Sequence, residues 1–476
     1  MPEATISELL FRPATDLAEM VRAGEVSARE LVDASLEQIE RLNPQINAFI
    51  HVDADAARET ADTIGPGDER PFAGVPLAIK DIGPPWEGRP LTFGAELFGD
   101  FVPDFDGSVV RRLKEAGFVP VGKTNAPEFG ILPVTEPRRY GPSRNPWDPG
   151  RTPGGSSGGS AAATASGMVP IAHGNDGGGS IRIPAACCGL VGLKPSRGRI
   201  SHAPTLGESY LATDGVLSRT VEDTARALDV LAGYEAGDVH WAPPPDEPFA
   251  RAAESDPTPM RLGYTIVPPL DAQVDPACVE AVDETVGLLE SLGHRVERFD
   301  LPWRDRDLFH TFTTMWAVGI GMTAMFASQI SGREPTEYAM EPLSWELYKR
   351  GRDTSAYEHA QAMVEMQRYA RAMVGQLAPY DAFLTPALAE RPVRIGEIDP
   401  QTGMEAFARA GRFTPFTAVV NVSGQPAISL PLYQGDDGLP TAVHLIGRPA
   451  GEWGLLALSA QLECARPWAD RRPPIS

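Results

Sequence analysis

The stretch GGSSGGSAAATASGMVPIAHGNDGGGS, residues 154–180, places two loops rich in glycine and serine around a short segment of regular structure. Within it, the small residues of 160–167 favour a helix and the apolar run 168–174 favours a strand. A helix followed by a strand can return the chain to the same edge of a sheet, where Ser156 and Ser180 would face each other. Glycine loses more backbone entropy on ordering than any other residue, so three glycines directly before Ser180 need an explanation. They could form a flexible linker, a phosphate cradle or a loop that aims its amides at a reacting oxygen.

Helix and strand signals alternate over much of the remaining chain. Short apolar runs at 74–81 and 118–125 are typical of strands, and the segment 108–117 between them is typical of a helix. This alternation predicts an α/β fold built on a large mixed, mostly parallel sheet. The strands are apolar throughout, without alternation, which is typical of a sheet covered by helices on both faces.

We expect one domain over residues 1–476. The chain shows no internal repeat or low-complexity tract, and its hydrophobic content of 42% is enough for a large core. Ser27 and Glu30 have the spacing of a capping box, so the first part is expected to be helical. The expected parts are a helical N-terminal segment (1–65), a core that carries the two glycine-rich loops (70–235), a helical insertion (303–372) and a C-terminal part of the core (380–476).

Composition excludes several classes of partner and cofactor. The net charge of −22 would repel phosphate backbones, so no nucleic acid partner is expected. No apolar run approaches the ~20 residues of a membrane span, and the N-terminal stretch lacks the basic and apolar regions of a signal peptide. We therefore expect a cytoplasmic protein with no membrane association. The four cysteines are too sparse for a disulfide scaffold, and no H-x-x-x-H or C-x-x-C pattern points to a metal site.

Two motifs of this sequence are misleading. Residues 117–124 match the phosphate-binding pattern G-x-x-x-x-G-K-[ST], but a helix precedes the first glycine and the intervening residues are typical of the strand itself. Residues 154–158 match the nucleophile elbow G-x-S-x-G, but RNPWDPGRTP before them cannot form a sheet strand. No histidine is spaced to complete such a triad, and His173 on its predicted strand is expected to be a buried, hydrogen-bonded residue.

A serine hydroxyl is a poor nucleophile until a base takes its proton. Since no histidine qualifies, Lys80 at the end of the apolar run GVPLAIKD is the candidate base. Burial can depress the pKa of a lysine and keep its amine neutral. The alternative is that Lys80 reaches solvent from the strand end. Asp81 points the other way if the strand continues.

The chain resembles a known family in several of its stretches. GGSSGGSAAATASG and GNDGGGSIRIPAACCGLVGLKPSRGRIS are similar to the signature of the amidase signature family, as are GVPLAIKD, GKTNAPEFG and NVSGQPAISLPLY. The resemblance runs over residues 72–449 and is weaker over 235–410. It implies the amidase signature fold and a Ser–cisSer–Lys triad that needs no cofactor. Ser180 would be the nucleophile, Ser156, after a cis peptide bond, the proton relay, and Lys80 the base.

The resemblance also assigns roles to the residues around Ser180. The oxyanion hole maps onto the main-chain amides of Gly177, Gly178, Gly179 and Ser180, and glycines let such amides converge on one point. Ser180 would form an acyl-enzyme that water then hydrolyses. Asp176 and Arg182 are expected to pair with each other and brace the glycine loop.

The sequence departs from the family at two positions. Asn175 stands where the family often has threonine, and His444 stands where it usually has glutamine. Neither residue is expected to touch the triad, so the two departures bear on the substrate pocket and not on the chemistry.

The weakly matching middle part is expected to shape the pocket. Met315, Trp316, Met322 and Phe326 lie on a predicted apolar helix; most such residues pack in the core, but this stripe could also line an apolar pocket. No pair of cationic residues is marked out for an anionic substrate, so a small neutral amide is expected.

The family includes hydrolases of linear, cyclic and aryl amides, esters and carbamates. This chain looks most like bacterial members that act on non-peptide amides, including nylon-type oligomers and urethanes. We expect a monomer or homodimer that cleaves such amides, with carbamates and esters as further substrates. The alternatives are the catalytic subunit of a tRNA-dependent glutamine amidotransferase and, in another class, a non-catalytic binding protein on the same scaffold.

Overall fold

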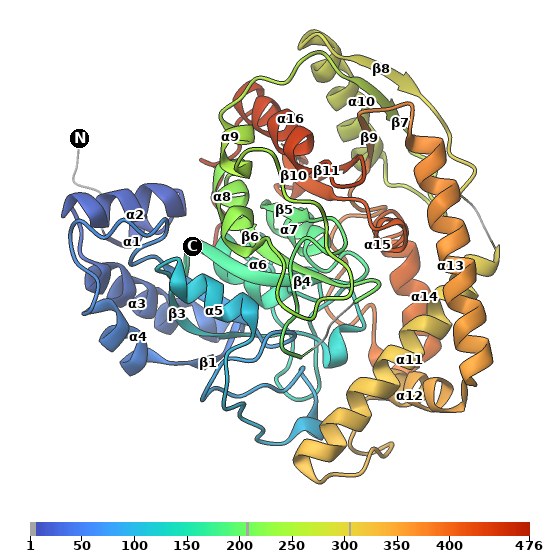
Figure 1. Cartoon of the computed structure of the whole chain (residues 1–476), viewed down its shortest axis with the longest axis horizontal. Coiled ribbons are helices and arrows are strands. Elements are labelled where there is room, and N and C mark those ends of the chain that lie inside the picture. The colour runs from blue at the N-terminus through green and yellow to red at the C-terminus, as the bar shows by residue number, and fades with distance from the viewer. Residues whose placement is uncertain (1–5, 206–208, 304–305) are drawn as a thin grey trace.

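A computed structural model describes residues 6–205, 209–303 and 306–476 of the chain. Its centre is an 11-stranded sheet in the order β1-β3-β2-β4-β6-β5-β10-β11-β9-β7-β8. The N-terminal helices lie at one side of the molecule, next to β1 and β3, and helices α11–α13 lie at the opposite side (Figure 1). The strands are β1 (Phe49–Val52), β2 (Pro76–Lys80), β3 (Val119–Thr124), β4 (Ile171–Asp176), β5 (Val191–Lys194), β6 (Thr213–Ser218), β7 (Arg261–Tyr264), β8 (Arg295–Arg298), β9 (Ala382–Pro386), β10 (Ala427–Gln434) and β11 (Pro440–Gly447).

The sheet is covered on both faces, as predicted. Every residue of β2, β3, β9 and β11 is buried. Since successive side chains of a strand point to opposite faces, complete burial requires cover on both sides. The apolar, non-alternating composition of these strands was therefore a reliable signal.

The sheet is mixed, but the expectation that it is mostly parallel is wrong. The pairs β2–β3, β2–β4, β7–β8 and β7–β9 are parallel, and the other six neighbouring pairs are antiparallel. The reason lies in the middle of the sheet, where β10 and β11 form a hairpin and β6 inserts between β4 and β5. Alternation of helix and strand along the chain does not reveal such insertions.

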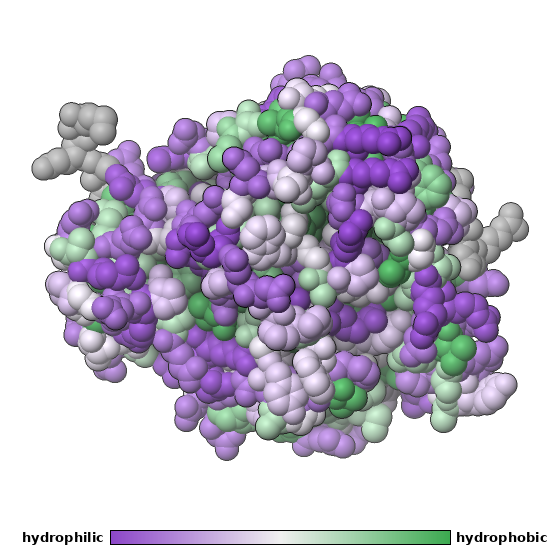
Figure 2. Space-filling view, turned by 45° about the horizontal axis from the view of Figure 1, so that its top comes forward, coloured by the Kyte–Doolittle hydropathy of each residue, from purple (hydrophilic) through white to green (hydrophobic). Residues whose placement is uncertain are grey.

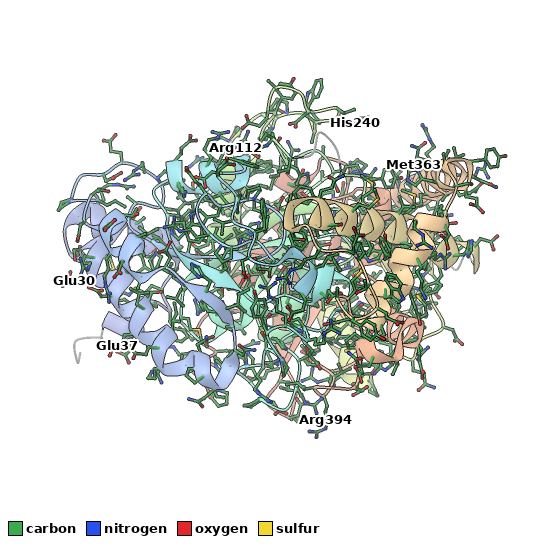
Figure 3. The ribbon with its side chains drawn as sticks, turned by 90° about the horizontal axis from the view of Figure 1, so that it is seen from below. Glu30, Glu37, Arg112, His240, Met363 and Arg394 are labelled. Carbon is green, nitrogen blue, oxygen red and sulfur yellow. The ribbon has the colours of Figure 1, made fainter. Side chains whose placement is uncertain are left out.

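The N-terminal segment is helical, as expected. Its helices are α1 (Ile6–Leu9), α2 (Ala14–Ala23), α3 (Ala28–Ile46) and α4 (Ala54–Ala61). The Ser27 side chain accepts the Glu30 amide at the start of α3 while the Glu30 carboxylate accepts the Ser27 amide, so the predicted capping box is confirmed. Glu30 and Glu37 of α3 project away from the rest of the chain (Figure 3).

Most of the remaining helices pack on the sheet or form the insertion. Those in contact with strands of the sheet are α6 (Gly158–Ala165), α7 (Arg182–Cys188), α8 (Val221–Leu231), α10 (Pro276–Ser291) and α16 (Glu452–Ala465), while α5 (Ser108–Glu115) packs on α8, and α9 (Phe249–Ala253) packs on α8 and α16. The segment expected to be a helical insertion contains α11 (Arg306–Ser331), α12 (Pro342–Asp353) and α13 (Ala356–Leu377), and α11 packs against both of the others. Two shorter helices, α14 (Met404–Phe413) and α15 (Ala418–Ser423), follow β9.

The surface is largely hydrophilic, with apolar side chains in separate small patches on the face shown in Figure 2. None of the helices in the described part of the chain is long and apolar enough to cross a membrane. Within the same residues, no group of three or more histidine, cysteine, aspartate or glutamate side chains could hold a metal ion.

Candidate active site

The two loops rich in glycine and serine meet, as predicted. One loop leads into α6 and the other connects β4 to α7. The amide of Ser157 donates a hydrogen bond of 3.2 Å to the carbonyl of Ser180. Gly155 and Ser180 line the same cavity. The chain therefore holds Ser156 and Ser180 on adjoining backbone segments.

Lys80 is the last residue of β2 and is fully buried. Its Nζ lies 2.7 Å from Ser156 Oγ, and the Gly155–Ser156 peptide bond is cis. The alternative in which Lys80 reaches solvent is therefore wrong. Burial lowers the pKa of Lys80 to about 7, although the charges of Asp214 and Asp176 act to raise it. Near neutral pH a large fraction of this side chain is an uncharged amine, which can accept a proton.

Asp81 points away from Lys80, as the strand geometry predicts. Its carboxylate accepts hydrogen bonds from the amide and hydroxyl of Thr92 and lies 3.8 Å from Lys123 Nζ. Lys123 is itself fully buried in β3. The lysine of the phosphate-binding pattern is thus inside the sheet, preceded by α5, and the structure confirms that residues 117–124 form no phosphate cradle.

His173 is buried and hydrogen-bonded, as expected. Its Nε2 lies 3.0 Å from Asp214 Oδ1, and His202 Nε2 lies 3.0 Å from the other carboxylate oxygen. The Nδ1 atom of His173 accepts a hydrogen bond of 3.4 Å from the main-chain amide of Lys80. Burial acts to raise the pKa of Asp214, but the two histidines outweigh it and hold that pKa below its usual range. Asp214 therefore remains ionised, and its negative charge acts on Lys80.

The glycine loop leaves most of its amides free. Within residues 6–205, 209–303 and 306–476, the amides of Gly177, Gly178 and Ser180 donate no hydrogen bond. Gly179 differs from the prediction, because its amide donates to Asp176 Oδ1 at 2.8 Å. The Gly178 carbonyl accepts the Thr417 hydroxyl at 2.7 Å, which turns the following amide toward Asp176. Including Gly179 in the oxyanion hole was therefore wrong.

Gly179 is required for another reason. Its φ is +131°, and a Cβ there would lie 2.4 Å from Thr417 Oγ1 and 2.5 Å from Ile183 Cδ1. L-amino acids with side chains rarely adopt such a φ, and neither neighbouring atom leaves room for a methyl group. The third glycine thus allows the loop to close against Thr417 and Asp176.

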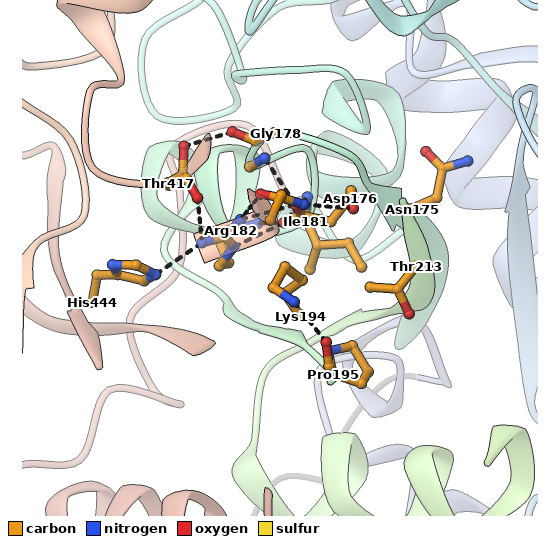
Figure 4. Close-up of polar contacts among 12 residues, drawn as sticks. Asn175, Asp176, Gly178, Ile181, Arg182, Lys194, Pro195, Thr213, Thr417 and His444 are labelled. Atoms are coloured by element: carbon orange, nitrogen blue, oxygen red, sulfur yellow. Dashed lines mark hydrogen bonds and ion pairs between the residues drawn. The ribbon is translucent and has the colours of Figure 1, made fainter. Parts of the chain in front are cut away.

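Asp176 and Arg182 form the expected pair. Both are fully buried, and Arg182 Nε and Nη2 donate to the two carboxylate oxygens, each at 2.9 Å. Arg182 Nη1 also donates to the Thr417 carbonyl at 3.1 Å (Figure 4). Burial acts to raise the pKa of Asp176, but the Arg182 guanidinium lowers it below its usual range. The pair joins the glycine loop to the chain segment between α14 and α15.

His444 lies outside the pocket, under this pair. It is fully buried, its Nε2 is 3.0 Å from Arg182 Nη1, and its Nδ1 is 3.0 Å from Thr385 Oγ1. Burial, followed by the charge of Arg182, holds the pKa of His444 well below its usual value, so this imidazole is neutral. As expected, His444 contacts neither Lys80 nor the two serines. It supports the pair of Arg182 and Asp176 and does not shape the substrate pocket.

Asn175 contacts Lys80, a residue of the expected triad, contrary to the expectation. Its Oδ1 accepts a hydrogen bond of 2.5 Å from Lys80 Nζ. Asn175 and His173 are two residues apart on β4 and so face the same side of the sheet, where both contact Lys80. This period of two was the signal in the sequence that could have placed Asn175 beside the lysine.

The cavity at Ser180 has an apolar wall. Its described lining residues include no charged side chain. They come from the loop 130–133, from α11 and from the segment that contains α14 and α15: Ile131, Leu132, Leu308, Phe309, Phe312, Trp316, Phe407, Thr414, Pro415, Val419 and Val422. A group that binds here must be uncharged and largely apolar.

Of the four pocket residues predicted on α11, only Trp316 lines this cavity. Its ring stacks on that of Phe312, with centroids 5.3 Å apart, and lies against Gly177 and Gly178. Met315 packs instead against a separate cluster around Met366, so the prediction for it was wrong.

The predictions for Met322 and Phe326 were also wrong, since these side chains are 64% and 45% exposed. Met315, Met322 and Phe326, at positions i, i+7 and i+11, share one helical face, whereas Trp316 lies about 100° around the helix from it. The face that does reach the pocket carries Phe309, Phe312 and Trp316, at positions i, i+3 and i+7. That spacing was present in the sequence and groups the two missed phenylalanines with Trp316, although it does not show that this face turns toward the pocket.

The comparisons with known proteins find amidases and amide hydrolases. The Amidase family model matches residues 30–456. The chain is 38% identical to a 6-aminohexanoate-cyclic-dimer hydrolase of Paenarthrobacter ureafaciens over 482 aligned residues, which cover 98% of this chain and 97% of the relative. A solved structure of 6-aminohexanoate cyclic dimer hydrolase matches with a TM-score of 0.93 at 37% identity, covering 98% and 99% of the two chains. A bacterial aryl acylamidase structure of the amidase signature family matches with a TM-score of 0.85 at 26% identity, covering 96% and 97%.

Proposed function

This chain belongs to the amidase family and is an amide hydrolase, and from that premise we propose that Ser180 is its nucleophile, Ser156 its proton relay and Lys80 its base. One observation carries the proposal: a fully buried lysine amine lies 2.7 Å from the hydroxyl of Ser156. A non-catalytic binding protein has no use for a costly buried amine held at hydrogen-bond distance from a serine hydroxyl next to Ser180.

The first chemical step forms an ester. The neutral Lys80 amine accepts the proton of Ser156, and Ser156 accepts the proton of Ser180. Ser180 Oγ attacks the substrate carbonyl carbon, and the carbonyl electrons move to oxygen. The free amides of Gly177, Gly178 and Ser180 then donate hydrogen bonds to that oxyanion.

The second half of the reaction releases the products. When the oxyanion collapses, the C–N bond breaks and the leaving amine takes a proton that returns from Lys80 through Ser156. The acyl group stays on Ser180 Oγ. Water, deprotonated by the same relay, attacks the ester, and the carboxylic acid leaves with Ser180 reprotonated. The cycle consumes one water and forms one acid and one amine, without a cofactor.

The pocket defines the substrate class. Because its described lining carries no charged side chain, we propose that the substrate is a small neutral amide, linear, cyclic or aryl, with an apolar acyl part. Carbamates and esters present the same carbonyl to Ser180 and are proposed as further substrates. The similarity to 6-aminohexanoate-cyclic-dimer hydrolases favours cyclic amides of ω-amino acids within this class.

Labelling by a small fluorophosphonate tests the nucleophile. We expect one covalent adduct per chain, located on the peptide that contains Ser180, and no adduct in Ser180→Ala. Intact-mass measurement followed by peptide mapping gives the answer without knowledge of the substrate. Ser166→Ala is a matched control, because that serine is buried at the end of α6 and bonds only to carbonyls of its own helix. Equal labelling of Ser180→Ala and wild type would reject the assignment.

Trp316 is expected to set the preference for large acyl groups. Each methylene buried in the pocket contributes about 0.8 kcal/mol, so wild type should prefer hexanoyl to acetyl anilides. Trp316→Ala removes part of the apolar wall and is expected to reduce this preference about tenfold. Met322→Ala, on the same helix but 64% exposed, should leave the preference unchanged. Ratios of kcat/KM for the two anilides measure the effect, and an unchanged ratio in Trp316→Ala would contradict the assignment of this pocket.

A further inference from the structure

Lys80 has a second polar partner besides Ser156. We propose that Asn175 is a positioning residue that takes one N–H of the neutral Lys80 amine and thereby turns the nitrogen lone pair toward Ser156. The proposal deepens the function proposed above and rests on it. It is carried by the 2.5 Å contact between Lys80 Nζ and Asn175 Oδ1, next to the 2.7 Å contact to Ser156 Oγ.

The orientation of the Asn175 side chain is fixed by its other end. The Nδ2 group donates to the main-chain carbonyl of Ile82 at 2.9 Å, so the oxygen is left facing Lys80. Gly83 makes room for this arrangement. Its φ is +106°, and a Cβ at that position would lie 2.7 Å from Asn175 Nδ2. The chain thus leaves space beside Lys80 for an amide in one orientation.

The chemistry of a primary amine explains why that orientation matters. A neutral amine has two N–H groups and one lone pair, and rotation about the Cε–Nζ bond decides which of them faces Ser156. An amide oxygen only accepts hydrogen bonds, so Asn175 must receive an N–H. With one N–H held there, the lone pair can face Ser156 and accept its proton. Without this acceptor, the amine can rotate to donate to Ser156, an arrangement in which it cannot act as a base.

The charges around the amine explain why an uncharged acceptor suits this position. Asp214 on β6 and Asp176 on β4 favour the protonated form of Lys80, and His173 on β4 contacts its main-chain amide. A further carboxylate at hydrogen-bond distance would hold the proton on the lysine. Asn175 accepts the same hydrogen bond without adding a negative charge.

The rate of fluorophosphonate labelling at Ser180, measured from pH 5.5 to 9.5, tests the proposal without a known substrate. For wild type we expect the rate to rise with pH and level off above about 7, the pKa of Lys80. Asn175→Asp should move this midpoint upward by about 1–3 pH units. Asn175→Leu should lower the plateau rate ~10–100-fold, because the amine is no longer oriented. Asn175→Thr, which keeps an acceptor oxygen, should recover most of that loss.

Controls separate positioning from folding and from the proposed triad. Asn43→Asp makes the same change of charge at an asparagine that bonds to the main chain of Phe49, outside the site, and should leave the profile unchanged. Melting temperatures show whether each variant is folded. Folded Asn175→Asp and Asn175→Leu proteins with the wild-type midpoint and plateau would overturn the role of Asn175 alone. If the fluorophosphonate does not label Ser180 in the wild-type protein, the proposed triad is wrong, and this proposal is wrong with it.

Discussion

Replacing Lys80 by methionine is expected to lower kcat/KM for an amide by ~10³–10⁴-fold and, at the same time, to make the protein no less stable. Activity falls because Ser156 loses the base that accepts its proton. Stability does not fall because a fully buried lysine is costly to the folded state and methionine fills a similar apolar volume. Loss of activity with a retained melting temperature therefore distinguishes a catalytic lysine from a structural one.

The direction in which activity and folding stability change with pH follows from the pKa of Lys80. Since the amine must be neutral, wild-type kcat/KM should fall about tenfold per pH unit below the Lys80 pKa of about 7 and stay level above it. Because that pKa lies below the usual 10.5, the folded state binds this proton more weakly than the unfolded chain. The contribution of Lys80 to stability is therefore greatest above pH 10.5, falls as the pH is lowered, and is constant again below about 7.

Lys80→Met should remove the pH dependence of kcat/KM and the part of the pH dependence of stability that comes from Lys80. Its residual activity should be flat with pH, and its melting temperature should exceed that of wild type most clearly at pH 7 and below. Lys349→Met, at an exposed position of α12, is the matched control and should behave like wild type. Steady-state kinetics on one anilide and thermal melting at several pH values give the comparison. A variant with more than a tenth of wild-type activity would show that Lys80 is not the base.

The second large effect is expected on stability. Arg182→Met leaves Asp176 as a buried carboxylate without its cation, and breaking a buried pair from one side costs about 3–5 kcal/mol. Asp176 also accepts the amides of Gly179 and Ile181, at 2.8 and 3.2 Å, so the glycine loop should loosen and labelling of Ser180 should slow. The midpoint of urea unfolding measures the first effect and the labelling rate the second.

A double variant tests whether the cost comes from the uncompensated charge. Arg182→Met combined with Asp176→Asn removes both charges and should cost clearly less than the sum of the single changes. Arg29→Met, at an exposed ion pair with Asp62, should cost no more than about 1 kcal/mol. Additive costs in the double variant would indicate that the pair acts as two independent packing contacts.

The sequence predicted the parts of the site whose chemistry restricts the choice of residue. Neither packing nor chain flexibility alone calls for three successive glycines, two serines and a lysine at the end of an apolar strand, and the structure places them together. The pairing of Asp176 with Arg182, which the resemblance to the amidase signature family implied, is also present in the structure. These features depend on short stretches of chain and on local geometry.

The features that could not be predicted depend on long-range packing. Strand direction was missed because β6 pairs between strands that the sequence places on either side of a helix. The amide of Gly179 was misassigned because its orientation is set by Thr417, more than two hundred residues away. The pocket wall was misplaced because a helix with apolar residues on several faces does not show which of them turns inward.

The catalytic groups and the pocket wall come from different stretches of the chain. The proposed base, relay and nucleophile lie within residues 80–180, whereas much of the wall is supplied by α11, α14 and α15. Mutations at wall positions other than Trp316, and away from Thr417, can change which molecules fit without altering the contacts of the glycine loop. Evolution can therefore explore new substrates on this scaffold with fewer inactive intermediates, and an engineer can randomise most of the wall while keeping the proposed reacting groups in place.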